Sequence, residues 1–99
     1  MKVIDHEPQM WFLLQDDDGL LLDVNCSHSA FGYSVLIELE EDETRNFQNE
    51  GHVYLNQLAG EINFSAPGVR GSSSPYQARN IRQARGDEVM AVVREWQNS

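Results

Sequence analysis

The sequence predicts an α+β fold, an antiparallel sheet of three to four strands in a β-meander with two helices packed on one face. Two observations carry this prediction. Residues 20–26 and 31–40 alternate apolar and polar side chains as a strand does, and apolar side chains after residue 41 recur with the period of a helix. The strands precede the helices, which is typical of an α+β arrangement. A length of 99 residues is that of a single domain over 1–99.

The first two predicted strands form a hairpin. Residues 10–15 are rich in large, β-prone side chains, and residues 16–19 are three aspartates and a glycine, a polar sequence suited to a tight turn. In residues 20–26 the alternation places four apolar side chains on one face: Leu20, Leu22, Val24 and Cys26. Residues 31–40 continue the alternation and form the third strand. Residues 76–81, with a less regular pattern, are the candidate for a fourth.

The first predicted helix has an apolar stripe at helical spacing, with acidic residues and the candidate caps Asp42 and Thr44 at its N-terminal end. The stripe consists of Phe47, Tyr54, Leu55, Leu58 and Ile62. Gly51 lies in the middle of the stripe and costs about 1 kcal/mol relative to alanine. We therefore expect a weak point at Gly51 or a helix that begins near Glu50. Residues 66–68 end this helix.

The last helix is expected to begin near residues 86–87. Its apolar face consists of Val89, Val92, Val93 and Trp96. Arg79, Arg82 and Arg85 are spaced by three and form a short basic strip at the start of this region. Three arginines in a chain of net charge −9 release too few counterions for useful binding of nucleic acid. We expect them instead to balance acidic residues of the same chain.

The charge of the chain is unevenly distributed. Residues 1–61 hold 13 acidic and 2 basic residues, and residues 62–99 hold 3 acidic and 5 basic residues. An acidic surface repels nucleic acid and anionic membranes, because phosphate binding requires Lys and Arg. It attracts basic surfaces and raises the rate of encounter with them. The alternative, that acidity serves only to keep a small protein in solution, stays open.

The sequence lacks the residue patterns of an enzyme or a metal site. Cys26 and the three scattered histidines, His6, His28 and His52, do not have the paired spacing of a zinc site. Residues 16–19 depart from a calcium loop at the next position, where an apolar residue replaces an oxygen ligand. We therefore expect no catalytic residue, no cofactor and no metal. The absence of a long apolar segment or a signal peptide predicts a cytoplasmic protein.

Several stretches, taken in order along the chain, carry a resemblance to a known family. They are residues 22–31 (LDVNCSHSAF), 54–59 (YLNQLA), 62–67 (INFSAP), 74–80 (SPYQARN) and 93–96 (VREW). Together they resemble the immunity protein 10 family of bacterial polymorphic toxin systems, over about residues 10 to 97. The resemblance implies a non-enzymatic cytoplasmic antidote that binds the toxin encoded beside it. It implies no catalytic residues.

We predict that the acidic N-terminal two-thirds of the chain binds the cognate toxin, for example a basic nuclease domain, and blocks it by occlusion. The predicted contacts are exposed acids on the turn and the outer edges: Asp16, Asp17, Asp18, Glu38, Glu40, Glu41, Asp42 and Glu43. Interface energy concentrates in a few aromatic positions, so Trp11, Tyr33 or Tyr54 is expected as an anchor, with core packing as the alternative for each.

Nucleic acid and membranes are not expected as partners, and the chain is predicted to be a monomer or a homodimer. The alternative function is a small structural or regulatory adaptor, a homodimer joined through an open sheet edge.

Overall fold

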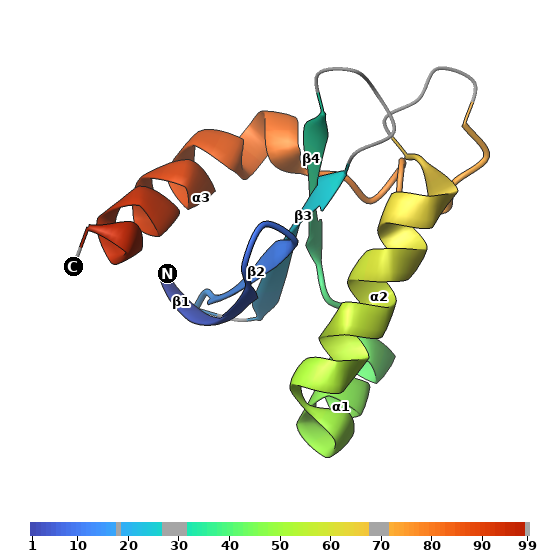
Figure 1. The fold of residues 1–99 in the computed structure, drawn as a ribbon, viewed down its shortest axis with the longest axis horizontal. Coiled ribbons are helices and arrows are strands. Elements are labelled where there is room, and N and C mark those ends of the chain that lie inside the picture. Colours follow the sequence, from blue (N-terminus) through green and yellow to red (C-terminus); the bar gives the residue numbers. More distant parts are fainter. Residues whose placement is uncertain (18, 27–31, 68–71, 99) are drawn as a thin grey trace.

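The computed structural model of the chain describes residues 1–17, 19–26, 32–67 and 72–98. Its fold is of the α+β class: a four-stranded antiparallel sheet, with the strands in chain order, followed by three helices (Figure 1). The strands are β1 (Lys2–Glu7), β2 (Trp11–Gln15), β3 (Leu20–Cys26) and β4 (Tyr33–Glu38). The helices are α1 (Glu41–Glu50), α2 (His52–Ser65) and α3 (Arg82–Gln97).

The predicted hairpin is confirmed as β2 and β3. Their register pairs Trp11 with Val24 and Gln15 with Leu20, and the Asp16 N–H closes the turn by donating to the Gly19 carbonyl at 2.9 Å. The third predicted strand is confirmed as β4. The sequence did not reveal β1, which pairs with β2 and forms an edge of the sheet.

The candidate strand at residues 76–81 is wrong, because these residues form turns beside β4. The Ile81 N–H donates to the Leu36 carbonyl at 2.8 Å, and the Asn80 side chain accepts the Leu36 N–H at 3.1 Å. This short segment therefore covers part of the outer edge of β4 without adding a strand.

The helices lie on opposite faces of the sheet, so the predicted packing on one face is not confirmed. Buried side chains of α2 pack with Leu22 and Ile37 on one face, and those of α3 pack with Leu21 and Leu36 on the other (Figure 1). Both β3 and β4 carry consecutive apolar residues, so the sheet is apolar on both faces. Each face therefore needs its own covering layer.

The expected weak point at Gly51 is confirmed, because α1 ends and α2 begins there. Gly51 adopts a φ of 69°, which favours glycine, and its N–H donates to the Phe47 carbonyl at 2.7 Å. Helix α2 ends at Ser65 as predicted, before Ala66 in the left-handed conformation. The last helix begins at Arg82, earlier than expected, where the Asn80 side chain accepts the Arg82 N–H at 3.0 Å. No helix in the described ranges is both long and apolar enough to cross a membrane.

Candidate binding surface

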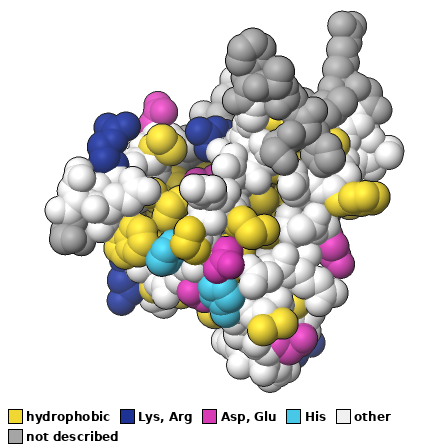
Figure 2. All heavy atoms as spheres, in the orientation of Figure 1, with side chains coloured by type: hydrophobic (Ala, Val, Ile, Leu, Met, Phe, Trp, Pro, Cys, Tyr) yellow, Lys and Arg dark blue, Asp and Glu magenta, His cyan; other side chains and the backbone are white. Residues whose placement is uncertain are grey.

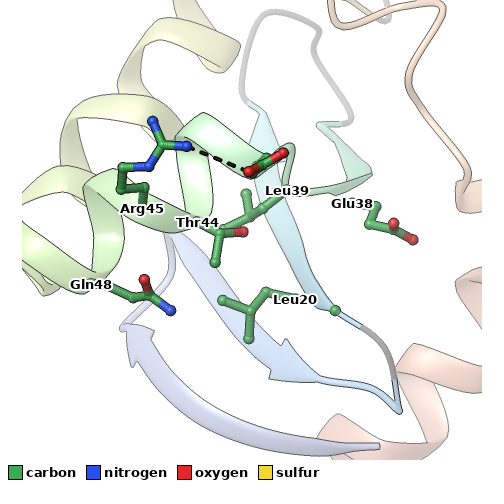
Figure 3. A pocket seen from close by; sticks show the side chains of 8 residues that line it. Leu20, Glu38, Leu39, Thr44, Arg45 and Gln48 are labelled. Carbon is green, nitrogen blue, oxygen red and sulfur yellow. Dashed lines mark ion pairs between the residues drawn. The ribbon is translucent and has the colours of Figure 1, made fainter.

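The β2–β3 turn and helix α1 meet at one end of the sheet. The Leu39 N–H donates to the Leu20 carbonyl at 2.9 Å, which joins the start of α1 to the start of β3. A hollow of about 450 Å³ lies between them, with Leu20 and Leu39 on the sheet side and Arg45 and Gln48 on α1 (Figure 3). Two of the predicted contact acids, Glu38 and Glu41, line this hollow. We call the surface formed by the β2–β3 turn, residues 38–40 and the start of α1 the acidic end.

The acidic end consists of the exposed acids Asp17, Glu38, Glu40, Glu41 and Asp42. Two arginines reach these acids. Arg79 lies 3.4 Å from Glu40, whose side chain is 63% exposed. Arg45 lies 3.5 Å from Glu41 in a pair whose side chains are 62% and 93% exposed. A pair this exposed contributes little to stability and leaves both side chains open to a partner. Asp18, another predicted contact, lies outside the described residues.

The arginine strip is tied to acids of the same chain, as predicted. Arg79 donates two hydrogen bonds to Glu43, at 2.6 and 3.1 Å, and Arg85 donates to Asp16 at 2.6 Å. The Arg85 guanidinium lowers the pKa of the Asp16 carboxyl. These ion pairs occupy basic side chains that could otherwise bind a phosphate backbone.

Two of the predicted contact acids therefore have structural roles. Glu43 is buried, and besides its bonds to Arg79 it accepts the Glu40 N–H at 2.8 Å, which caps α1 in place of the expected Asp42 or Thr44. Asp16 is half-buried and held by Arg85. Acidity alone could not distinguish these residues from the exposed acids, because the distinction depends on where the arginines fold.

Of the three predicted aromatic anchors, Trp11 is buried in the core and is excluded as a contact. It is 1% exposed, and its indole N–H donates to the Asn56 side-chain oxygen at 2.9 Å. Tyr33 and Tyr54 are half-buried against the same core. Tyr54 lies beside α1, where burial first and then the negative charges of Glu43 and Asp42 raise the pKa of its hydroxyl. Of the three predicted aromatic anchors, Tyr54 is therefore the one that lies beside α1 and its acidic residues.

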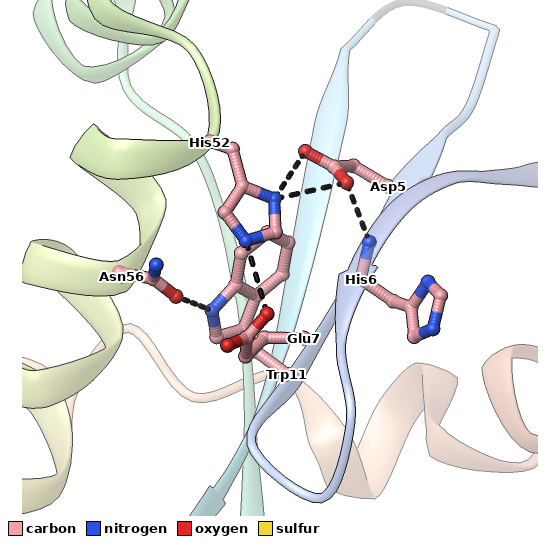
Figure 4. Close-up of polar contacts among 6 residues, drawn as sticks. All are labelled: Asp5, His6, Glu7, Trp11, His52 and Asn56. Carbon is pink, nitrogen blue, oxygen red and sulfur yellow. Dashed lines mark hydrogen bonds and ion pairs between the residues drawn. The ribbon is translucent and has the colours of Figure 1, made fainter.

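Sequence reasoning missed a polar cluster centred on His52, at the start of α2 (Figure 4). The His52 Nδ1 lies 3.0 and 3.1 Å from the two Asp5 oxygens, and its Nε2 lies 3.1 Å from Glu7. Its ring centroid is 4.8 Å from that of Trp11. Hydrogen bonding to Asp5, followed by Glu7, raises the pKa of His52. Both ring nitrogens thus hold α2 against β1, an arrangement suited to anchoring rather than to proton transfer.

Two further observations bear on metal binding and on cysteine reactivity in the described residues. In the part of the chain that the structure describes, no group of three or more His, Cys, Asp and Glu side chains could hold a metal ion. Cys26 is buried, and burial raises the pKa of its thiol, which disfavours the reactive thiolate. His28, the nearest histidine in the sequence, lies outside the described residues.

Comparison of this chain with protein-family models, curated proteins and solved structures found no match. The resemblance to the immunity protein 10 family therefore stays a prediction that rests on the sequence stretches alone.

Proposed function

We propose that this chain is a cytoplasmic immunity protein, which binds a cognate bacterial toxin and blocks it by occlusion without catalysing a reaction. The observation that carries the proposal is the pairing of the arginine strip. Arg79 neutralises the buried Glu43 and Arg85 neutralises the half-buried Asp16, while the acids of the acidic end keep exposed side chains. The negative charge left at the surface is therefore concentrated beside α1 and the β2–β3 turn.

A concentrated negative surface is suited to a positively charged protein. A toxin that acts on nucleic acid needs a basic surface for the phosphate backbone, and an acidic inhibitor can occupy that surface. Long-range attraction raises the encounter rate and weakens as salt screens the charges. The proposal thus specifies a partner with a basic face and an association rate that falls with ionic strength.

The test is neutralisation of the toxin encoded beside this chain. We expect toxin activity to be lost at a one-to-one ratio, and the complex to associate more slowly as salt is added. Replacing Asp17 and Asp42 together by Asn should slow association about threefold to tenfold at low salt. The matched control replaces Glu61 and Glu95, exposed acids on α2 and α3, by Gln and should leave the rate nearly unchanged. Full toxin activity at a stoichiometric excess of this protein would refute the proposal.

The alternative, an adaptor that dimerises through a sheet edge, has a specific location in the structure. The strand order leaves β1 and β4 at the edges, and residues 80–81 already contact β4. Strand β1 exposes Ile4 but has an irregular register between Val3 and Asp5, a feature that discourages pairing with a second strand. A tight dimer in sedimentation, in the absence of any partner, would favour this alternative.

A further inference from the structure

A second hollow, of about 290 Å³, opens between the sheet and α3, at the end of β3 far from the acidic end. Its walls include the apolar side chains Met10, Phe12 and Met90, and Asp23 of β3 also lines it. Phe12 and Asp23 are direct partners in the β2–β3 register, so their side chains lie next to each other on the face under α3. The hollow therefore holds one carboxylate among apolar side chains, together with the neutral polar side chains of Gln9, Asn25, Ser34 and Gln97.

The Asp23 carboxylate is not satisfied by the described part of the chain. Asp23 is 8% exposed, and its Oδ1 atom is buried with no hydrogen-bond partner. The nearest cation, Arg82, places its Nη1 atom 3.7 Å from Oδ1, within ion-pair range but too far for a hydrogen bond. A buried acceptor without a donor is costly, and native proteins rarely keep one without a role. Burial raises the pKa of this carboxyl, and the charge of Arg82 opposes the shift.

The rim of the hollow is open to solvent and includes exposed apolar side chains beside polar ones. Met10 and Met90 are 43% and 41% exposed, and hydrophobic side chains gather between α3 and the sheet (Figure 2). Trp96, near the end of α3, adds to this surface and lies with its ring centroid 5.8 Å from that of Phe12. Clustered exposed methionine and aromatic side chains around a hollow are typical of a protein contact.

We propose that this hollow receives an arginine side chain of a partner protein, whose guanidinium pairs with the Asp23 carboxylate once that side chain rotates its buried Oδ1 atom toward the hollow. The methylene stem packs against Met10, Phe12 and Met90. Arginine fits better than lysine, because its planar guanidinium is weakly hydrated and can stack on Phe12 while it donates. The inference goes beyond the proposed function, since any partner with a suitably placed arginine would satisfy it.

The chain offers built-in reporters for a direct test. It contains three methionines, two of which, Met10 and Met90, line the hollow, while Met1 lines a different one. With ¹³C-labelled methionine methyl groups, titration with N-acetyl-arginine methylamide should shift the Met10 and Met90 signals and leave Met1 in place. The citrulline analogue has the same shape without the charge, and it should produce no shift. Equal shifts from both compounds, or none from arginine, would overturn the inference, as would equal binding of the lysine analogue.

Variants locate the site without reference to any toxin. Asp23→Asn should weaken binding of the arginine compound about tenfold or more, whereas Asp17→Asn, the same change at the acidic end, should leave it intact. Met90→Arg adds an exposed cation beside the hollow and should also abolish the shift of Met10. Because Met90→Arg leaves Asp23 in place, it tests the site even if Asp23→Asn does not fold. Retained binding in both Asp23→Asn and Met90→Arg would place the site elsewhere, and none of these outcomes depends on toxin neutralisation.

Discussion

Two carboxylates in this protein are buried to almost the same extent, and each lies near an arginine, yet they are held very differently. At the corner between α1 and β4, Glu43 is 7% exposed and accepts two hydrogen bonds from Arg79 and one from the Glu40 backbone. On the face under α3, Asp23 is 8% exposed, its Oδ1 accepts no hydrogen bond, and Arg82 stays 3.7 Å away.

The difference is in hydrogen bonding: the chain supplies donors to the Glu43 carboxylate but none to the Oδ1 atom of Asp23. Burying a charged group is costly unless hydrogen bonds replace those it made with water. At Glu43 the chain supplies these bonds, so the residue fastens α1 to residues 74–80 and has nothing left for a partner. At Asp23 the cost is not recovered within the described residues. That contrast supports a structural role for the first carboxylate and a binding role for the second.

The largest expected effect on stability comes from replacing Arg79, the arginine that is hydrogen-bonded to Glu43. Arg79→Met leaves the buried Glu43 carboxylate without its charged partner and should lower the free energy of unfolding by about 3 kcal/mol. The double change of Glu43 and Arg79 to Met leaves no unpaired buried charge and should recover most of this loss. The recovery is incomplete because the Glu43 side chain no longer accepts the Glu40 N–H. Urea unfolding at neutral pH measures both. A double variant as unstable as Arg79→Met would show that the pair itself, rather than a stranded carboxylate, carries the stability.

A matched pair of isosteric changes tests the comparison directly. Glu43→Gln weakens charge-assisted hydrogen bonds and should lower the free energy of unfolding by about 1–2 kcal/mol. Asp23→Asn removes a buried charge that lacks hydrogen bonds at Oδ1 and should raise it by about 1 kcal/mol at neutral pH. Effects of the same sign would remove the distinction between the two carboxylates.

The direction of the pKa shift fixes the pH dependence of the Asp23→Asn variant. Folding raises the pKa of Asp23, so the folded state favours the protonated form. Below the ordinary pKa of about 4, the carboxyl is protonated in both the folded and unfolded states, and burial carries no penalty. The penalty develops as pH rises through the ordinary pKa toward the raised value. The gain from Asp23→Asn should therefore be complete at neutral pH and fade in acid, as urea midpoints across pH would show.

The sequence predicts the parts of this structure that depend on local pattern. The β2–β3 hairpin follows from alternation around an aspartate- and glycine-containing turn, and the break at Gly51 follows from the cost of glycine inside a helix. The pairing of the arginine strip with acids of the chain could also be predicted. A net charge of −9 makes nucleic acid an unfavourable partner for three arginines, and the chain offers many acids to pair with them.

The remaining features depend on contacts between distant segments. Residues 20–22 and 35–37 are apolar at every position, which is typical of strands that are buried on both faces. The alternation of the flanking residues predicted only one buried face. Strand β1 was missed because its acids Asp5 and Glu7 make it resemble a solvated segment, and only their contacts with His52 explain them. The setting of Asp23 was equally hidden, since no pattern near it shows that α3 covers it.

The smallest expected effect concerns His52, which extends the contrast because its bonds, like those of Glu43, are supplied within the chain. Folding raises the pKa of His52, so its contribution to stability is complete below the ordinary pKa of about 6.5 and is lost as pH rises through the higher folded value. The His52 side chain is 38% exposed, so screening should keep the change below about 1 kcal/mol. The free energy of unfolding should thus fall as pH rises above the ordinary pKa of about 6.5, and His52→Gln should flatten that slope. Asn56→Ala, which removes the hydrogen bond from Trp11 but no charge, should keep it. An unchanged slope in His52→Gln would mean that the two carboxylates on β1 hold α2 without any contribution from the charge of the histidine.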